Sequence, residues 1–155
     1  MGSMESLKQS GDRVKESMGE KVKAAQDVRQ QIDELKRGLE GMPTGLDQEI
    51  VTAIESARDQ GKQEALSDIS TAEREANSAR QEGNNVNREI DTKIGDNNAA
   101  ISKLEAIKST RYGRGADTAI GAARENTRRG EDIKSELQSA MEKAMGDIES
   151  ARSGI

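Results

Sequence analysis

The sequence predicts an all-α protein of three helices, arranged as elongated antiparallel hairpins with a long central helix. Two observations predict this fold. Apolar residues recur at steps of three and four along nearly the whole chain, which places them on one face of a helix. Ala, Glu, Lys, Leu and Arg supply 67 of the 155 residues, which approaches the composition of long helices and coiled coils. No segment of useful length shows the apolar–polar alternation of a half-buried strand.

Large apolar side chains are scarce in this chain. Ile, Leu, Val and Phe together supply 24 residues, fewer than the roughly 20% of a chain below which disorder is considered. Disorder also requires a high net charge, whereas 24 basic and 29 acidic residues leave only −5 here. The apolar residues therefore predict a narrow packing seam between helices and not a thick core.

The composition also limits the chemistry of the chain. It contains no histidine and no cysteine, and so lacks the usual general base near neutral pH and the strongest side-chain nucleophile. Carboxylate pairs such as Glu73 and Glu75 match neither a calcium-binding loop nor the motif of di-iron bundles. We expect no enzymatic activity, no catalytic residue, no cofactor, no metal and no small-molecule substrate.

The first helix is expected over about residues 5–40. Its apolar residues recur with a mean step of about 3.5, the repeat of a left-handed coiled coil. The segment from Gly41 to Gly45 contains the only proline and ends this helix. Gly2 and Ser3 precede a second methionine and are typical of residues left by cloning. We therefore expect a disordered start at residues 1–4 and a single helical domain over residues 5–155.

A second apolar series continues in one phase and predicts a long helix over about residues 46–110. The phase is informative because a loop would normally reset it. Two segments, 83–85 and 95–98, nevertheless contain residue types that end or begin helices. The alternative is an up-down four-helix bundle, broken near Gly83, with helices over 5–40, 46–82, 86–110 and 117–152.

A glycine-rich turn at residues 109–115 precedes a third helix over about residues 117–152, with Asp117 as its expected N-cap. Short turns make consecutive helices antiparallel neighbours. The first turn is expected to place Leu35 opposite Ile50 and Ile54, and small residues at 72–83 predict a crossing of all three helices. The expected helix-packing seam consists of Leu7, Val14, Met18, Ile32, Leu35, Ile50, Ile54, Gly61, Ile69, Ala72, Ala76, Ala79, Gly83, Ile90, Ile94, Ile133, Leu137 and Ile148.

The most distinctive short motif lies in the second turn, where Tyr112 stands between Arg111 and Arg114. It is the only aromatic residue of the chain, and tyrosine and arginine are the residues that most often anchor protein interfaces. The alternative is a solvated turn whose tyrosine packs on its own helix ends. We expect no nucleic-acid partner, because the isoelectric point is near 5.0 and none of the three long segments that the turns separate is basic.

Since the seam is thin, we expect a protein partner or a second copy to supply further burial. The expected function is that of a non-enzymatic scaffold, adaptor or secretion-related protein that acts through coiled-coil surfaces. The alternative is a membrane-active or lipid-binding helical domain of a translocated factor, although the lack of aromatic and lysine-rich faces makes membrane binding unexpected. The sequence shows neither a signal peptide nor a transmembrane stretch, so we expect a cytoplasmic location or export without a signal peptide.

Overall fold

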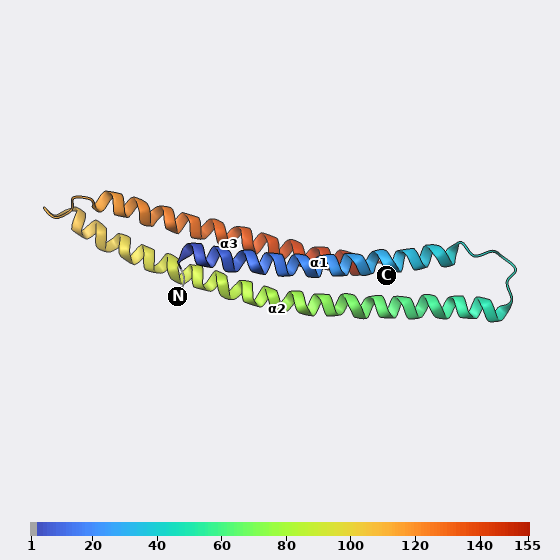
Figure 1. Cartoon of the computed structure of the whole chain (residues 1–155). Helices are drawn as coiled ribbons and strands as arrows, with labels where there is room; N and C mark the ends of the chain where they lie inside the picture. The colour runs from blue at the N-terminus through green and yellow to red at the C-terminus, as the bar shows by residue number, and fades with distance from the viewer. Residues whose placement is uncertain (1–2) are drawn as a thin grey trace. The chain divides into compact units, whose positions relative to one another are not determined.

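The computed structural model describes residues 3–155 and contains three α-helices joined by two turns (Figure 1). Helix α1 spans Met4–Glu40, α2 spans Gln48–Lys108 and α3 spans Ala116–Arg152. None of the residues 3–155 lies in a strand. The all-α fold and the long central helix are confirmed, and each helix begins and ends within two residues of its expected bounds.

Helix α2 is a single helix of 61 residues, so the four-helix alternative with a break near Gly83 is wrong. Gly83 is buried within the helix, and a Cβ atom at this position would lie 2.4 Å from Met141 Sδ and 3.1 Å from Val14 Cγ1. The glycine therefore permits close packing of three helices and does not end one. Tertiary packing here outweighs the low helix propensity of glycine.

The first helix begins earlier than expected. Ser3 caps it, because the backbone N–H of Ser6 donates a hydrogen bond to Ser3 Oγ at 3.2 Å. Met4 was expected within a disordered start, but it is helical and only 3% exposed, because its side chain packs in an apolar cluster with Leu7 and Ile90. Residues 1 and 2, which belong to the same expected start, lie outside the described residues.

The third helix begins at Ala116, and Asp117 is not its N-cap. Gly115 precedes the helix with a φ of +90°, a conformation that glycine adopts without steric cost. The backbone carbonyl of Gly115 accepts the first helical hydrogen bond, from Ala119 N at 3.2 Å. Asp117 lies instead in the first turn of α3, where its carboxylate pairs with Lys108 at 2.8 Å.

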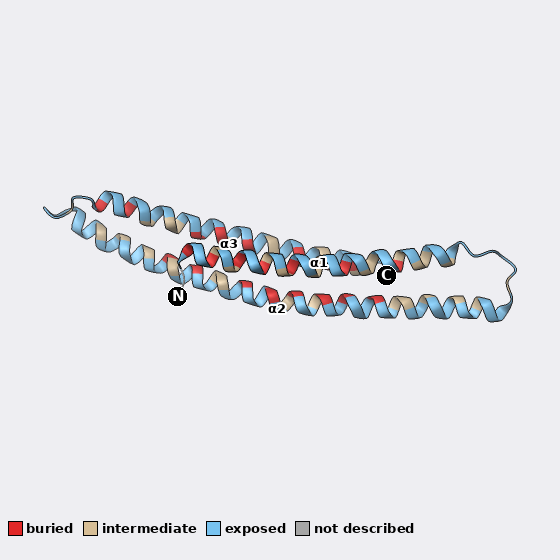
Figure 2. Ribbon diagram, in the orientation of Figure 1, coloured by how far each residue is buried: buried red, intermediate tan, exposed pale blue. Residues whose placement is uncertain are grey.

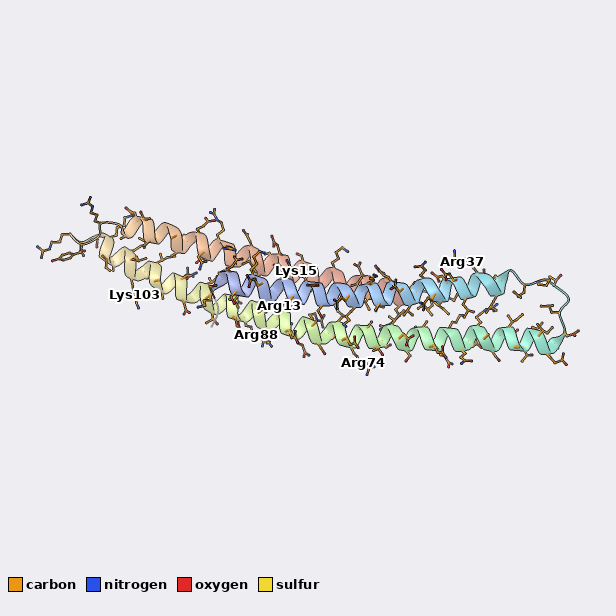
Figure 3. All side chains as sticks on the ribbon, in the orientation of Figure 1. Arg13, Lys15, Arg37, Arg74, Arg88 and Lys103 are labelled. Carbon is orange, nitrogen blue, oxygen red and sulfur yellow. The ribbon has the colours of Figure 1, made fainter. Side chains whose placement is uncertain are left out.

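The described residues form two compact units, and the single helical domain expected over residues 5–155 stays a prediction. Unit 1 contains residues 3–16 and 80–141, and unit 2 contains residues 17–79 and 142–155. Each unit includes a segment of all three helices. Segments that are far apart in the sequence belong to one unit because they pack side by side. Buried residues recur along each helix, separated by exposed ones (Figure 2). Charged side chains such as Arg74 and Lys103 project from the helices (Figure 3).

In unit 1 the core lies where the three helices meet. The apolar cluster combines Met4 and Leu7 of α1 with Ile90 and Ile94 of α2 and Ile133 of α3. The helices approach closely at Gly130, where a Cβ atom would lie 2.6 Å from Met4 Cε and 3.3 Å from Ile90 Cγ2. The absent side chain thus provides the space into which a methionine packs.

In unit 2 the core combines a few large side chains with many small ones. Met18, Ile69 and Ile148 are almost fully buried. The other buried residues of α2 in this unit are the alanines Ala65, Ala72, Ala76 and Ala79. The end of α3 is joined to α1 by polar contacts. Arg29 Nη1 donates a hydrogen bond to the carbonyl of Ala151 at 3.1 Å, and Lys36 Nζ donates one to the carbonyl of Ile155 at 3.2 Å.

Most residues of the expected seam are buried. Fourteen of the eighteen fall in the buried class, and Leu35, Ile54 and Gly61 are half-buried. Ile50 differs, because 45% of its surface is exposed. It was expected to pack against Leu35, so its exposure indicates a different register in the first hairpin.

The expected register of the first hairpin is wrong. Leu35 was expected opposite Ile50 and Ile54, but it lies at Gly61, with its Cδ2 atom only 2.4 Å from the position of a Cβ on Gly61. The ion pair of Lys21 with Glu75, at 3.1 Å, belongs to the same shifted register. The turn at residues 41–47 is extended where a tight reversal was expected, so the first two turns of α2 continue past the end of α1.

Two ion pairs define the register of the second hairpin. Lys134 of α3 pairs with Asp91 of α2 at 2.5 Å, and Arg124 pairs with Glu105 at 2.6 Å. These pairs join positions that a reversal at residues 113–114 places opposite each other. The Asp91 carboxylate, mainly through its hydrogen bond, raises the pKa of Lys134.

Close packing at Gly83 can be tested with an alanine substitution. Gly83→Ala is expected to lower the free energy of unfolding by about 1–3 kcal/mol, because the added methyl group overlaps Met141 and presses on Val14, whose branched side chain is stiff. Gly95→Ala is the control, since no atom lies within 4 Å of its Cβ position, and it is expected to raise stability by about 0.8–1 kcal/mol. Urea unfolding followed by circular dichroism measures both. Equal stabilisation by both substitutions would contradict the close packing.

Candidate interaction site

The motif in the second turn presents an exposed aromatic side chain. Tyr112 is 71% exposed, so it does not pack on its own helix ends. The guanidinium carbon of Arg111 lies 4.8 Å from the centre of the tyrosine ring, a cation–π distance. Arg111 Nη2 also donates a hydrogen bond to Tyr112 Oη at 2.6 Å. The two side chains that most often anchor interfaces thus lie together at the surface.

Hydrogen bonds within the turn order its backbone around Tyr112. Thr110 N donates to the carbonyl of Ile107 at 2.9 Å, and Gly113 N donates to the carbonyl of Thr110 at 3.1 Å. Tyr112 N donates to Thr110 Oγ1 at 3.2 Å. Gly113 is required for this path, because a Cβ there would lie 2.6 Å from the carbonyl oxygen of Lys108. The turn therefore holds Tyr112 in a defined position.

Basic groups surround this tyrosine. Residues 103–114, which we name the basic hairpin end, contain four basic residues and one acidic residue, a net charge of +3. Lys108 is paired, and its hydrogen bond with Asp117 raises its pKa. No ion pair of residues 3–155 includes Lys103, Arg111 or Arg114. These three cations remain available to an acidic partner.

A second surface, at the first turn, was not predicted from the sequence. The shifted register of the first hairpin leaves the start of α2 without a helix opposite it. A cavity of about 360 Å³ opens there within unit 2. It is lined mainly by apolar residues from the end of α1, the turn and the start of α2, namely Leu39, Met42, Pro43, Leu46, Val51 and Ile54.

The segment that contains this cavity exposes apolar side chains and is strongly acidic. Met42 is 46% exposed and Ile50, next to Val51, is 45% exposed. Residues 40–59, which we name the acidic hairpin end, contain five carboxylates and one arginine, a net charge of −4. In the described part of the chain none of these groups forms an ion pair. They are Glu40, Asp47, Glu49, Glu55, Arg58 and Asp59.

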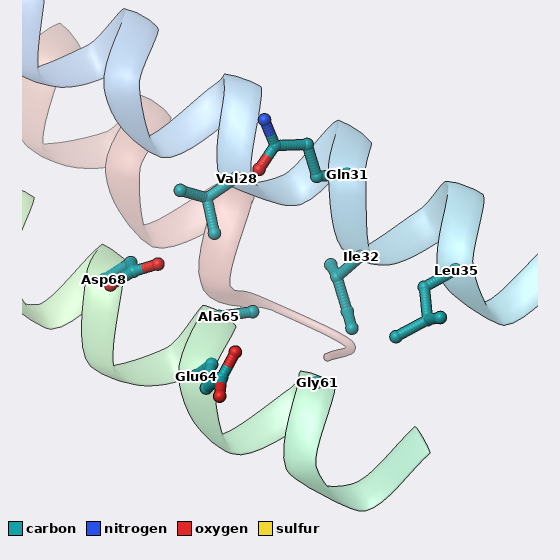
Figure 4. A pocket seen from close by; sticks show the side chains of 8 residues that line it. All are labelled: Val28, Gln31, Ile32, Leu35, Gly61, Glu64, Ala65 and Asp68. Carbon is teal, nitrogen blue, oxygen red and sulfur yellow. The ribbon is translucent and has the colours of Figure 1, made fainter. Parts of the chain in front are cut away.

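A smaller hollow lies between α1 and α2 further along unit 2 (Figure 4). Its volume is about 160 Å³. Ile32 and Leu35 of α1 face Gly61 and Ala65 of α2 across it, and the carboxylate of Glu64 lies at its edge. The hollow exists because Gly61 and Ala65 have little or no side chain, so it belongs to the helix-packing seam.

Three asparagines of α2 and one threonine of α3 have a buried side-chain polar atom without a hydrogen-bond partner. In residues 3–155 these are Asn77 Oδ1, Asn87 Oδ1, Asn97 Nδ2 and Thr127 Oγ1. Asn97 continues the apolar series of Ile90 and Ile94 and is half-buried. An asparagine at such a position fixes the register of paired helices at a cost in stability.

The chain matches no family model, no curated protein and no solved structure. In the described residues no helix has a stretch apolar enough to span a bilayer. No three carboxylates of residues 3–155 converge as ligands of a metal ion. Each of the two hairpin ends combines exposed apolar side chains with charged groups that form no ion pair within residues 3–155.

The cost of Asn97 can be measured. Asn97→Leu is expected to raise the free energy of unfolding by about 1 kcal/mol, because an amide with an unpaired N–H is replaced by an apolar side chain in the seam. Asn98→Leu is the control, since Asn98 is exposed, and a change within about 0.5 kcal/mol is expected. Thermal unfolding compares the two. A loss of stability in Asn97→Leu would show that the asparagine has a partner in solution.

Proposed function

We propose that this protein is a non-enzymatic helical component that acts by protein–protein interaction, with the acidic hairpin end as its principal binding surface. The observation that most supports this proposal is the open apolar cavity between the end of α1, the first turn and the start of α2. The chain has few large apolar residues, and several of them line this cavity, where none is fully buried in the core.

The anatomy of the acidic hairpin end is that of a protein interface. Interfaces bury an apolar centre within a polar rim. Here Glu55 and Arg58 line the apolar cavity, and the segment 40–59 that contains it carries a net charge of −4. Burying one large apolar side chain contributes about 1.5–3 kcal/mol, so Met42 and Ile50 alone offer a useful fraction of a binding energy. The partner that fits is a protein surface with a projecting apolar or aromatic side chain flanked by basic residues.

Binding would also complete the packing of this region. Leu35, Val51 and Ile54 are half-buried where α1 and α2 form a two-helix hairpin, and short unsupported helices are only marginally stable. A partner that covers these residues adds the burial that a third helix provides elsewhere in unit 2. We therefore expect the acidic hairpin end to be more stable when a partner protein is bound than when it is free.

The proposal can be tested by affinity capture from an extract of the cells that make the protein. The double substitution Met42→Ser and Ile50→Ser is expected to reduce the amount of captured partner at least tenfold, since about 1.4 kcal/mol corresponds to a factor of ten. Leu66→Ser is the matched control, because Leu66 is an apolar residue of unit 2 with 39% exposure and lies outside residues 40–59. Equal capture by both variants, with unchanged circular dichroism, would refute the proposed surface.

A further inference from the structure

We infer that the occupant of the acidic hairpin end is the basic hairpin end of a second copy of this chain. The inference rests on the proposed function and names its partner. Copies would associate in a heterologous, head-to-tail arrangement, with Tyr112 of one copy inserted into the apolar cavity of the next. The acidic hairpin end includes the start of α2, and the basic hairpin end includes the last residues of α2 (Figure 1).

The first argument is charge complementarity. The acidic hairpin end carries a net charge of −4 and the basic hairpin end +3. Within the described residues none of the five carboxylates of the former has a basic partner, and Lys103, Arg111 and Arg114 of the latter have no acidic one. Contact between two acidic ends, or two basic ends, would instead place like charges together and cost energy. The pairing of unlike ends is the favoured one.

The second argument is the chemistry of the two surfaces. Tyr112 projects from an ordered turn and is 71% exposed, and Ile107 nearby is 45% exposed. A tyrosine with a fixed backbone loses little conformational entropy on burial. The cavity offers it apolar side chains, together with Thr44 and Glu55 as hydrogen-bond acceptors for the phenol that a buried tyrosine requires.

The third argument concerns what each copy leaves unoccupied. A heterologous contact uses a different surface on each partner, so every bound pair still has one free acidic end and one free basic end. Such contacts produce open chains of copies unless the rotation between copies closes a ring. Growth of the assembly with concentration is therefore a direct consequence of this inference.

Complementation between two blocked variants tests the inference. One variant carries Met42→Ser and Ile50→Ser, and the other carries Ile107→Ser and Tyr112→Ser. Sedimentation velocity is expected to show wild-type assemblies that grow beyond a dimer, and each variant alone as a monomer. An equal mixture of the two is expected to form a heterodimer and nothing larger, because only one functional pair of ends remains.

The control and the contradicting outcomes are distinct. Leu66→Ser is expected to assemble as the wild type does, and circular dichroism of each variant reports that it is folded. A wild type that stays monomeric at all concentrations, a mixture that stays monomeric, or a single variant that still dimerises would each overturn the inference. If the wild type stays monomeric but captures another protein in a manner dependent on Ile50, only the inference fails and the proposed function stands.

Salt provides an independent measurement. Raising the ionic strength from about 0.1 M to about 1 M shortens the Debye length from about 10 Å to about 3 Å. The wild-type association constant is expected to fall at least tenfold, because the rims of the two ends attract each other by charge. Association that strengthens with salt would show a purely apolar contact and would overturn the pairing of these two ends.

Discussion

Close approach of helix backbones at residues without bulky side chains is the constraint on which this structure depends. At Gly83 and Gly130 a side chain would overlap a methionine of a neighbouring helix, and at Gly61 it would overlap Leu35. The chain has few large apolar residues, so its helices gain contact by approaching closely, since dispersion attraction requires atoms nearly in contact. The glycines lower helix propensity, and the packing that they permit offsets that cost.

The same narrow seam explains why the ends of the hairpins differ from the rest. Helix α2 has 61 residues, whereas α1 and α3 have 37 each, so neither neighbour can cover α2 along its whole length. Near its start α2 has only α1 as a neighbour and near its end only α3, and Ile50 and Ile107 are each 45% exposed there. Exposed apolar residues beside unpaired charges of opposite sign are features of surfaces that bind another protein.

Sequence reasoning succeeded where the determining interactions are local. The helix bounds, the phase of the seam and the accessibility of the turn around Tyr112 follow from residue spacing and turn chemistry. At Gly83 it left a helix break open as an alternative to the continuous helix, because glycine both ends helices and permits close packing. It failed at Ile50, where the expected register was wrong. Charge counts over long segments also concealed the basic hairpin end, because its four cations lie within twelve residues of an otherwise acidic segment.

The sequence by itself determined that the chain is helical, which residues share a face and which chemistry the side chains can offer. Each of these properties depends on neighbours within one or two helical turns. Only the tertiary structure decided between the continuous helix that the apolar phase predicts and its broken alternative, and showed that Leu35 lies at Gly61 and that an apolar cavity stays open beside the first turn. These features depend on the path of residues 41–47 and on the distance between helix backbones, and neither is encoded in the spacing of apolar residues.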